Sequence, residues 1–462
     1  MITPAASEIL ASFVAQSRYE QLPAGVVAKV KLHVLDFLGV ALAGSAWDFG
    51  AAMRSVCVAM GGEPTCTVIG SAERRPAVWA ALANGTFGHG LDFDDTHTES
   101  VVHVSASVVP AALAICEELG AGGGDFLLAV AVGMETNIRI GLVARGGFHD
   151  RGVHPTGVCG TFAAALIAGK VIGLDERRLV DALGLANSQA AGSLEFLTDG
   201  SWAKRMHGGW AAHSGLVAAR LAAAGFSGPK GSLDGRFGLY RRYLGDQGWD
   251  LTRLSAAIGE RWELLNTGLK PYPCCHYNHA FADCAATLRR QHNIQPDDVE
   301  RVECFIAPRQ VPIVCEPEST KTTPRNDYDA KFSLHYAVAS ILVRGRLDVD
   351  DFTDAAIRDP AVLAMAGRVV YREDPDSDFP ARFPGWVRIH LRDGNTVEQR
   401  EPINRGSAEN PLSEEDVRAK FRANAGRVVS PATTEAIIDA VAVLEESSDL
   451  RRLTSALAAV QA

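Results

Sequence analysis

The stretch GTFAAALIAGKVIG, residues 160–173, combines alanine and glycine with larger apolar side chains that recur three and four positions apart. This spacing places the apolar side chains on one face of a helix, and the small residues let a second helix approach closely. VGMETNIRIGLVA, residues 132–144, has the same character. Similar patterns up to about residue 265 predict a mainly α fold. Helices are predicted over residues 26–42, 75–86, 126–142, 160–172, 176–190 and 211–224.

The pattern changes near residue 268. VERVECFIA (299–307) alternates as a strand does, and GWVRIHLRDGNTVEQR (385–400) predicts a hairpin with Asp393 and Gly394 at its turn. We therefore expect an all-helical domain of residues 1–267 and 405–462 and a smaller α+β domain of residues 268–404. The smaller domain is expected to contain helices over 281–291, 329–343 and 355–370. Three short helices, over 413–423, 431–444 and 450–460, are expected to fold back on the first domain.

Composition narrows the class of protein. Of the 462 residues, 47% are hydrophobic and 22% are charged, as in globular proteins that bury a sizeable core. The formal net charge of -10 argues against nucleic acid or an anionic membrane as a partner, because both attract clustered Lys and Arg. No uninterrupted apolar run reaches the ~18 residues of a membrane span, and no signal-like segment opens the chain. We expect a cytoplasmic protein. The nine cysteines form no CxxC pair, so neither a disulfide framework nor a zinc knuckle is indicated.

The segment GHGLDFDDTHTESVVH, residues 88–103, carries three histidines and four acidic residues between apolar runs. Buried charges cost several kcal/mol unless they are paired, so such a cluster predicts a pocket. A structural alternative is that Asp94 and Asp95 cap a turn. The residue types also suit divalent metals, which makes a metal-dependent hydrolase a distant alternative, although the spacing matches no metal-binding motif. We predict no metal.

Four further polar segments interrupt apolar sequence: HPTG (154–157), DGSWAKRMHGGWAAHSG (199–215), KPYPCCHYNH (270–279) and YDAKFSLHY (328–336). Each contains a histidine or a lysine. Gathered around one cavity, they would supply cations for carboxylates and bases that titrate near neutrality. Removal of a proton next to a carboxylate requires both kinds of group.

Together LDFDDT, HPTG, KRMHGG, KPYPCC and AKFSLHYAVA resemble the MmgE/PrpD family, in order, over about residues 9–444. That family includes 2-methylcitrate dehydratases, cis-aconitate decarboxylases and iminodisuccinate epimerases. The resemblance implies a homodimer in which the smaller α+β domain is a lid over the all-helical domain. It also implies an active site between the two domains that needs no metal or organic cofactor.

Carried over position by position, the family's decarboxylase pattern places five groups in the site. The implied groups are an acid, a hydroxyl, two imidazoles and a lysine, at Asp92, Thr96, His103, His154 and Lys204. The spacing from Thr96 to His103 is one residue longer here than in the decarboxylase pattern.

The segment KPYPCCHYNH departs from the decarboxylases. They have a histidine where Cys275 stands, and His276 is displaced from it by one residue. This departure favours a dehydratase or an epimerase. We expect Lys270 and His276 to bind substrate, and Cys274 and Cys275 to be packing residues.

The leading hypothesis is therefore a cofactor-free lyase that dehydrates a small hydroxylated di- or tricarboxylate such as 2-methylcitrate. His154 would be its base or acid and His103 its second proton-transfer group. The alternatives are an epimerase of a dicarboxylate such as iminodisuccinate, a cis-aconitate-type decarboxylase and a non-catalytic binding protein. The chain has no P-loop, dinucleotide fingerprint or GxSxG elbow, which disfavours phosphate-driven and acyl-transfer chemistry.

Overall fold

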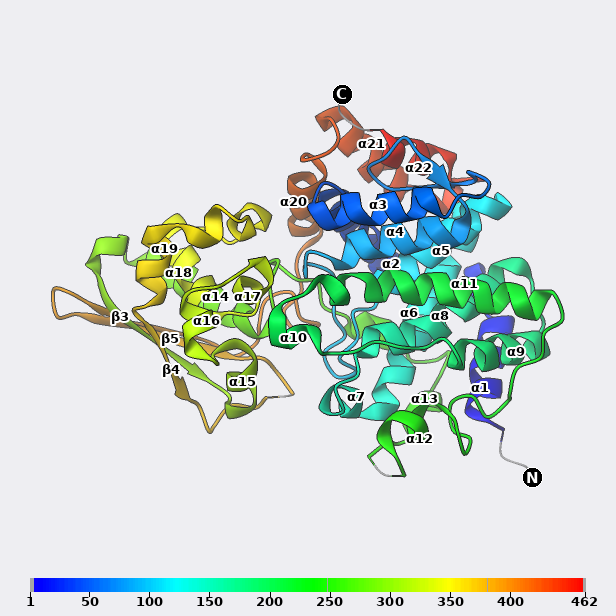
Figure 1. Cartoon of the computed structure of the whole chain (residues 1–462), viewed down its shortest axis with the longest axis horizontal. Coiled ribbons are helices and arrows are strands. Elements are labelled where there is room, and N and C mark those ends of the chain that lie inside the picture. The colour runs from blue at the N-terminus through cyan, green and yellow to red at the C-terminus, as the bar shows by residue number, and fades with distance from the viewer. Residues whose placement is uncertain (1–3, 247, 380, 460–462) are drawn as a thin grey trace.

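The computed structural model describes residues 4–246, 248–379 and 381–459. Two long apolar helices, α6 (Gly123–Ala144) and α8 (Pro155–Ile172), lie at the centre of the larger helical layer (Figure 1). By length and composition both could cross a membrane. In their most apolar stretches of 18 residues, however, 100% of the α6 stretch and 83% of the α8 stretch is buried inside the protein. Burial against α5 (Ser105–Leu119) and α11 (His207–Ala223) accounts for their apolar character.

Small residues allow these helices to cross closely, as the sequence predicts. A Cβ atom at Gly160 would lie 2.5 Å from the Ser107 Oγ atom on α5. One at Gly209 of α11 would lie 2.1 Å from the main-chain oxygen of Leu82 on α4 (Ala77–His89). Any larger side chain at these positions would force the helices apart.

The C-terminal helices return to the same layer, as predicted. Phe421 of α20 packs against α2, where a Cβ atom at Gly39 would lie 2.8 Å from its ring. Val417 and Phe421 belong to the hydrophobic cluster that also contains Val34 and Leu38. Residue 460, the predicted end of the last helix, lies outside the described residues. The longer helices of this layer include α1 (Ala6–Gln16), α2 (Ala24–Ser45), α3 (Asp48–Ala59) and α9 (Glu176–Asn187), and the C-terminal helices are α20 (Glu414–Ala425), α21 (Pro431–Ala442) and α22 (Arg451–Ala458). Shorter helices are α7 (Gly147–Asp150), α10 (Phe196–Asp199), α12 (Leu239–Leu244) and α13 (Thr252–Ser255).

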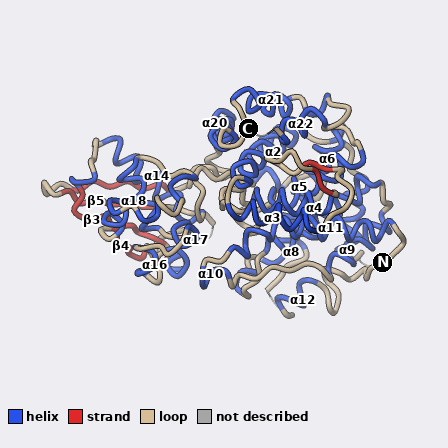
Figure 2. The backbone as a smooth tube through the Cα atoms, turned by 45° about the horizontal axis from the view of Figure 1, so that its top comes forward, coloured by secondary structure: helices blue, strands red, loops and turns tan. Residues whose placement is uncertain are grey.

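A four-stranded sheet with the order β4-β3-β5-β6 lies at the other end of the molecule (Figure 2). β3 (Val299–Ile306) confirms the predicted strand. β5 (Gly385–Leu391) and β6 (Thr396–Glu401) confirm the predicted hairpin, whose turn glycine, Gly394, has φ +90°. The helices α14 (His279–Gln291) and α18 (Leu334–Arg344) contact the sheet.

Two helix predictions in this segment are corrected. The predicted helix 355–370 is instead a 3-10 turn (Ala356–Arg358) and the short helix α19 (Pro360–Ala366), and β4 (Val369–Glu373) follows, pairing parallel with β3. The β-branched Val369 is buried in this pairing, so tertiary contacts override the helical pattern. The predicted helix 329–343 is divided into α17 (Asp327–Lys331) and α18, because Ser333 is extended and caps α18 through its hydroxyl.

The segment around the sheet has a hydrophobic cluster of its own, which includes Phe281, Val302, Val338 and Val387. The mainly α fold is confirmed. The division into a helical domain of residues 1–267 and 405–462 and a lid of residues 268–404 stays a prediction.

Candidate active site

Asp92 lies just after α4, between two lysines that come from distant segments. Its carboxylate forms an ion pair with Lys204 Nζ and lies 3.3 Å from Lys270 Nζ, and all three side chains are buried. Burial alone would raise the pKa of Asp92, but the charges of Lys204 and Lys270 outweigh it and hold this pKa well below its usual range. Two buried ammonium groups therefore share one carboxylate, which leaves one positive charge for a further anion.

The backbone of Asp92 is also unusual. Its φ of +56° is in the left-handed region, which costs a residue other than glycine about 1–2 kcal/mol. Lys270 Nζ donates a hydrogen bond to the Asp92 main-chain oxygen at 2.8 Å. Lys270 thus contacts both the main-chain oxygen and the carboxylate of Asp92, and the strained turn places this carboxylate next to Lys204.

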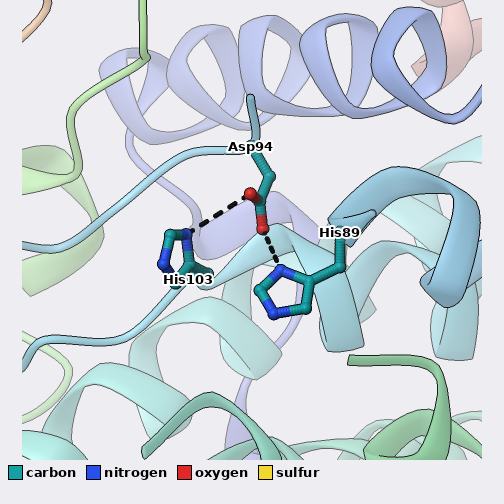
Figure 3. A group of neighbouring side chains, drawn as sticks. All are labelled: His89, Asp94 and His103. Carbon is teal, nitrogen blue, oxygen red and sulfur yellow. Dashed lines mark hydrogen bonds and ion pairs between the residues drawn. The ribbon is translucent and has the colours of Figure 1, made fainter. Parts of the chain in front are cut away.

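Asp94 forms a separate contact set with two imidazoles (Figure 3). Its Oδ2 atom is 2.6 Å from His89 Nδ1, and its Oδ1 atom is 3.4 Å from His103 Nδ1. The main-chain oxygen of Asp95 lies 3.1 Å from the same His103 nitrogen, and the Thr96 hydroxyl lies 3.4 Å from it. A carbonyl oxygen can only accept, so His103 carries its proton on Nδ1. Its Nε2 lone pair has no partner among the described residues and is left for a substrate.

Burial keeps His103 neutral. It lowers the pKa of this imidazole to about 4, although Asp94 acts in the opposite direction. The side chain is 14% exposed, the most open of the Asp94 set. His103 is thus an accessible, uncharged base whose Nδ1 atom faces the carboxylate of Asp94.

His154 precedes α8, but its side chain does not cap that helix. Its Nδ1 atom lies 2.9 Å from His207 Nδ1, and its ring centre lies 6.1 Å from that of His103. The hydroxyl of Thr156 accepts a hydrogen bond from the His103 main-chain N–H at 3.0 Å rather than capping α8. Burial is the largest of several effects that lower the pKa of His154 well below its usual value. Two neutral imidazoles therefore lie side by side, close to the paired lysines.

Sequence models of the MmgE/PrpD N-terminal domain and C-terminal domain match residues 8–252 and 272–446. The chain belongs to the MmgE/PrpD family. It is 30% identical to the cis-aconitate decarboxylase of Mus musculus, over 99% of this chain and 94% of that protein. It is 29% identical to the Homo sapiens cis-aconitate decarboxylase, over 94% and 90% of the two chains, and 28% identical to that of Aspergillus terreus (strain NIH 2624 / FGSC A1156), over 95% and 93%. The predicted family is confirmed.

This MmgE/PrpD chain brings most of the predicted site residues together. Asp92, Lys204 and Lys270 form the first contact set described above, while Thr96, His103 and His154 lie in or beside the second. His276 lies near both sets, because the charges of Lys270, His103 and Asp92 act on its pKa, and its Nε2 atom is 2.8 Å from the side-chain amide of Asn404. Its ring packs on His279 and Phe383.

The ligand-type residues of the metal hypothesis are divided among several contacts; they are His89, Asp92, Asp94, Asp95, His97 and His103. Asp95 binds His33 at 2.6 Å, and His97 binds Ser100 at 3.0 Å. His89, Asp94 and His103 keep ligand-type atoms within 4.8 Å of one another, a geometry that could hold a metal ion. In this structure they are joined by hydrogen bonds (Figure 3).

The neighbouring cysteines of the family's KPYPCC segment are both buried. Burial, followed by the charge of Asp92, raises the pKa of the Cys275 thiol to about 11. The thiol is therefore neutral near pH 7, as expected for a packing residue rather than a nucleophile.

Three residues of this site were not predicted. His89 joins Asp94, His207 joins His154, and Lys331 donates to main-chain oxygens of two site loops. His207 and Lys331 lie within segments whose polar character is visible in the sequence, KRMHGG and AKFSLHY. Their partners, however, are more than 50 positions away, so sequence spacing gives no sign of the contacts.

Proposed function

We propose that this MmgE/PrpD chain is a cofactor-free lyase that dehydrates a small hydroxylated di- or tricarboxylate of the 2-methylcitrate type. One observation carries the proposal: the free Nε2 atom of His103 belongs to a site in which Lys204 and Lys270 share the single carboxylate of Asp92. A substrate carboxylate would neutralise the remaining positive charge. The same cation would stabilise the second negative charge that develops when the adjacent carbon loses a proton.

His103 is the base in this mechanism. Its Nε2 lone pair takes the proton from the carbon next to the bound carboxylate, and Asp94 at 3.4 Å stabilises the imidazolium that forms. The electrons of the broken C–H bond form the C=C bond, and the C–O bond to the hydroxyl breaks. The imidazolium returns its proton to that hydroxyl, so water leaves and the base is regenerated.

His154 has a different role, because among the described residues its Nδ1 atom contacts His207 rather than a carboxylate. We assign it as a neutral hydrogen-bond donor to the substrate carboxylate, whose charge grows during proton removal. A neutral imidazole with a lowered pKa is suited to this role.

Decarboxylation is a second candidate, because the curated relatives named above are cis-aconitate decarboxylases. A substrate that already contains a C=C bond would lose CO2 and then accept a proton. The neutral thiol of Cys275, in place of the histidine of the decarboxylase pattern, weighs against it. An epimerase would use the same base but would expel nothing.

A product assay distinguishes the three reactions. The enzyme is incubated in D2O with 2-methylcitrate, citrate, cis-aconitate or iminodisuccinate, and alkene absorbance, CO2 release and deuterium incorporation are followed. Dehydration predicts new alkene absorbance from a hydroxylated substrate without CO2. CO2 release from cis-aconitate alone would identify a decarboxylase, and deuterium exchange without alkene would identify an epimerase.

A further inference from the structure

The contact between His154 and His207 joins two nitrogens of the same kind. Their Nδ1 atoms are 2.9 Å apart, and both residues are buried. Two lone pairs at this distance repel each other, and so do two N–H groups. One Nδ1 atom must therefore carry a proton and the other must not.

The surroundings hold both rings in place. Gly192 accepts a hydrogen bond from the His154 main-chain N–H at 3.1 Å, and a Cβ atom at this glycine would lie 3.2 Å from the His154 Cβ atom and 3.6 Å from His207 Nδ1. The ring of Phe196 packs edge-on against both imidazoles, with centroid distances of 6.1 Å. The backbone at Gly192 and the ring of Phe196 thus pack against both imidazoles.

The direction of the hydrogen bond follows from what the outer nitrogen of His154 faces. Among the described residues, none accepts from or donates to the Nε2 atom of His154, which is left for a ligand. A substrate carboxylate only accepts hydrogen bonds, so it requires an N–H at that position. This step rests on the function proposed above.

We propose that His207 is a positioning residue that donates its Nδ1–H to His154 and thereby holds His154 as the Nε2–H tautomer. His103 has the opposite arrangement, since Asp94 and the Asp95 carbonyl oxygen keep its proton on Nδ1. Asp94 thus makes His103 a base, and His207 makes the neighbouring His154 a hydrogen-bond donor.

Neutron diffraction of the deuterium-exchanged wild-type enzyme without substrate tests the tautomers directly. We expect deuterium on His207 Nδ1 and His154 Nε2, and none on His154 Nδ1. Deuterium on His154 Nδ1 would overturn the proposal. The result does not depend on which substrate the enzyme uses, so it stands apart from a failure of the proposed dehydratase activity.

The variants His207→Asn and His207→Asp test the consequence for catalysis. Both side chains place a polar atom near the position of Nδ1, but only Asn can donate, whereas an ionised Asp accepts and draws the proton onto His154 Nδ1. We expect His207→Asp to lower kcat about a hundredfold or more, and His207→Asn to stay within about tenfold of wild type. Equal kcat values in two variants that both unfold cooperatively would show that His207 only fills space. If either variant does not fold, the wild-type neutron map alone decides.

Discussion

The Nζ atom of Lys331 lies 2.9 Å from the main-chain oxygen of Leu91, the residue immediately before the strained Asp92. The same ammonium group donates to the main-chain oxygen of Pro273 at 2.8 Å and lies 4.1 Å from the centre of the Phe352 ring. Burial lowers the pKa of Lys331 to about 8. One side chain thus joins the loop of the Asp92 site to the loop that begins with Lys270.

Replacing Lys331 with Met should remove both bonds and leave two buried carbonyl oxygens without this donor. We expect a loss of about 2–4 kcal/mol in the free energy of unfolding and a fall in kcat, because the Asp92 turn is no longer held. Lys321→Met is the matched control, since Lys321 also donates to two main-chain oxygens, of Ile313 and Phe332. The control should lose similar stability in urea unfolding and retain kcat. A Lys331 variant with unchanged kcat would contradict the link to the site.

Asp92→Asn should leave Lys204 and Lys270 without their shared anion. We expect the unliganded variant to be less stable by about 3–5 kcal/mol, the usual cost of breaking a buried ion pair. A bound polycarboxylate then replaces the missing charge, so the ligand should raise the Tm of the variant more than that of the wild type. Glu135→Gln, which weakens the buried pair with Arg139, should lose stability without this larger ligand effect. Equal Tm shifts in all three proteins would argue against an anion site at the lysines.

Asp94→Asn should reduce kcat by about tenfold to a hundredfold, because the imidazolium of His103 loses the charge that stabilises it. His103→Gln should reduce kcat further, by a hundredfold or more. Asp95→Asn serves as the control, since the Asp95 carboxylate binds His33 and Ser105 instead. Steady-state kinetics should show the losses in kcat rather than in KM. Full activity of His103→Gln would exclude it as the base.

His335 should make folding sensitive to acid. It is buried in α18, and burial, followed by the charge of Lys321, lowers its pKa to about 4. Above about pH 6.5 the imidazole is neutral in both the folded and unfolded states. As the pH falls from about 6.5 to 4, only the unfolded state binds the proton, so folding loses up to about 3 kcal/mol through this group.

The variant His335→Leu should remove that part of the pH dependence. Urea unfolding at pH 7 and pH 4.5 measures the difference, which should be smaller in the variant than in the wild type. The same difference in both proteins would assign the acid sensitivity to other groups.

Exhaustive chelation should leave kcat unchanged, because the proposed mechanism uses only the side chains of this chain. The measurement addresses the cluster of His89, Asp94 and His103, whose ligand-type atoms lie within 4.8 Å of one another. Loss of activity on chelation and its return with one equivalent of a divalent metal would instead support a metal site there.

The helical part of the fold and the hairpin could be predicted because each depends on local periodicity. Alanine and glycine at three- and four-residue spacing predict α6 and α8, and alternation around Asp393 and Gly394 predicts the hairpin. Val369 shows the limit of such patterns. It continues the helical spacing of Val362, Met365 and Ala366 in α19, and only its parallel pairing with β3 makes it a strand residue.

The order of residues is enough to identify the family, the mainly α fold and the residue types available to the site. Which charges meet depends on the packing of the folded chain. Asp92, Asp94 and Asp95 are neighbours in sequence, yet each binds different partners. Asp92 binds two lysines, Asp94 binds two imidazoles, and Asp95 binds a third imidazole and Ser105. The backbone at Asp92 is left-handed, and the partners of these side chains come mostly from segments that only folding brings together. The protonation state of a buried group depends on those partners and on burial, so it follows from the packed structure rather than from the order of residues.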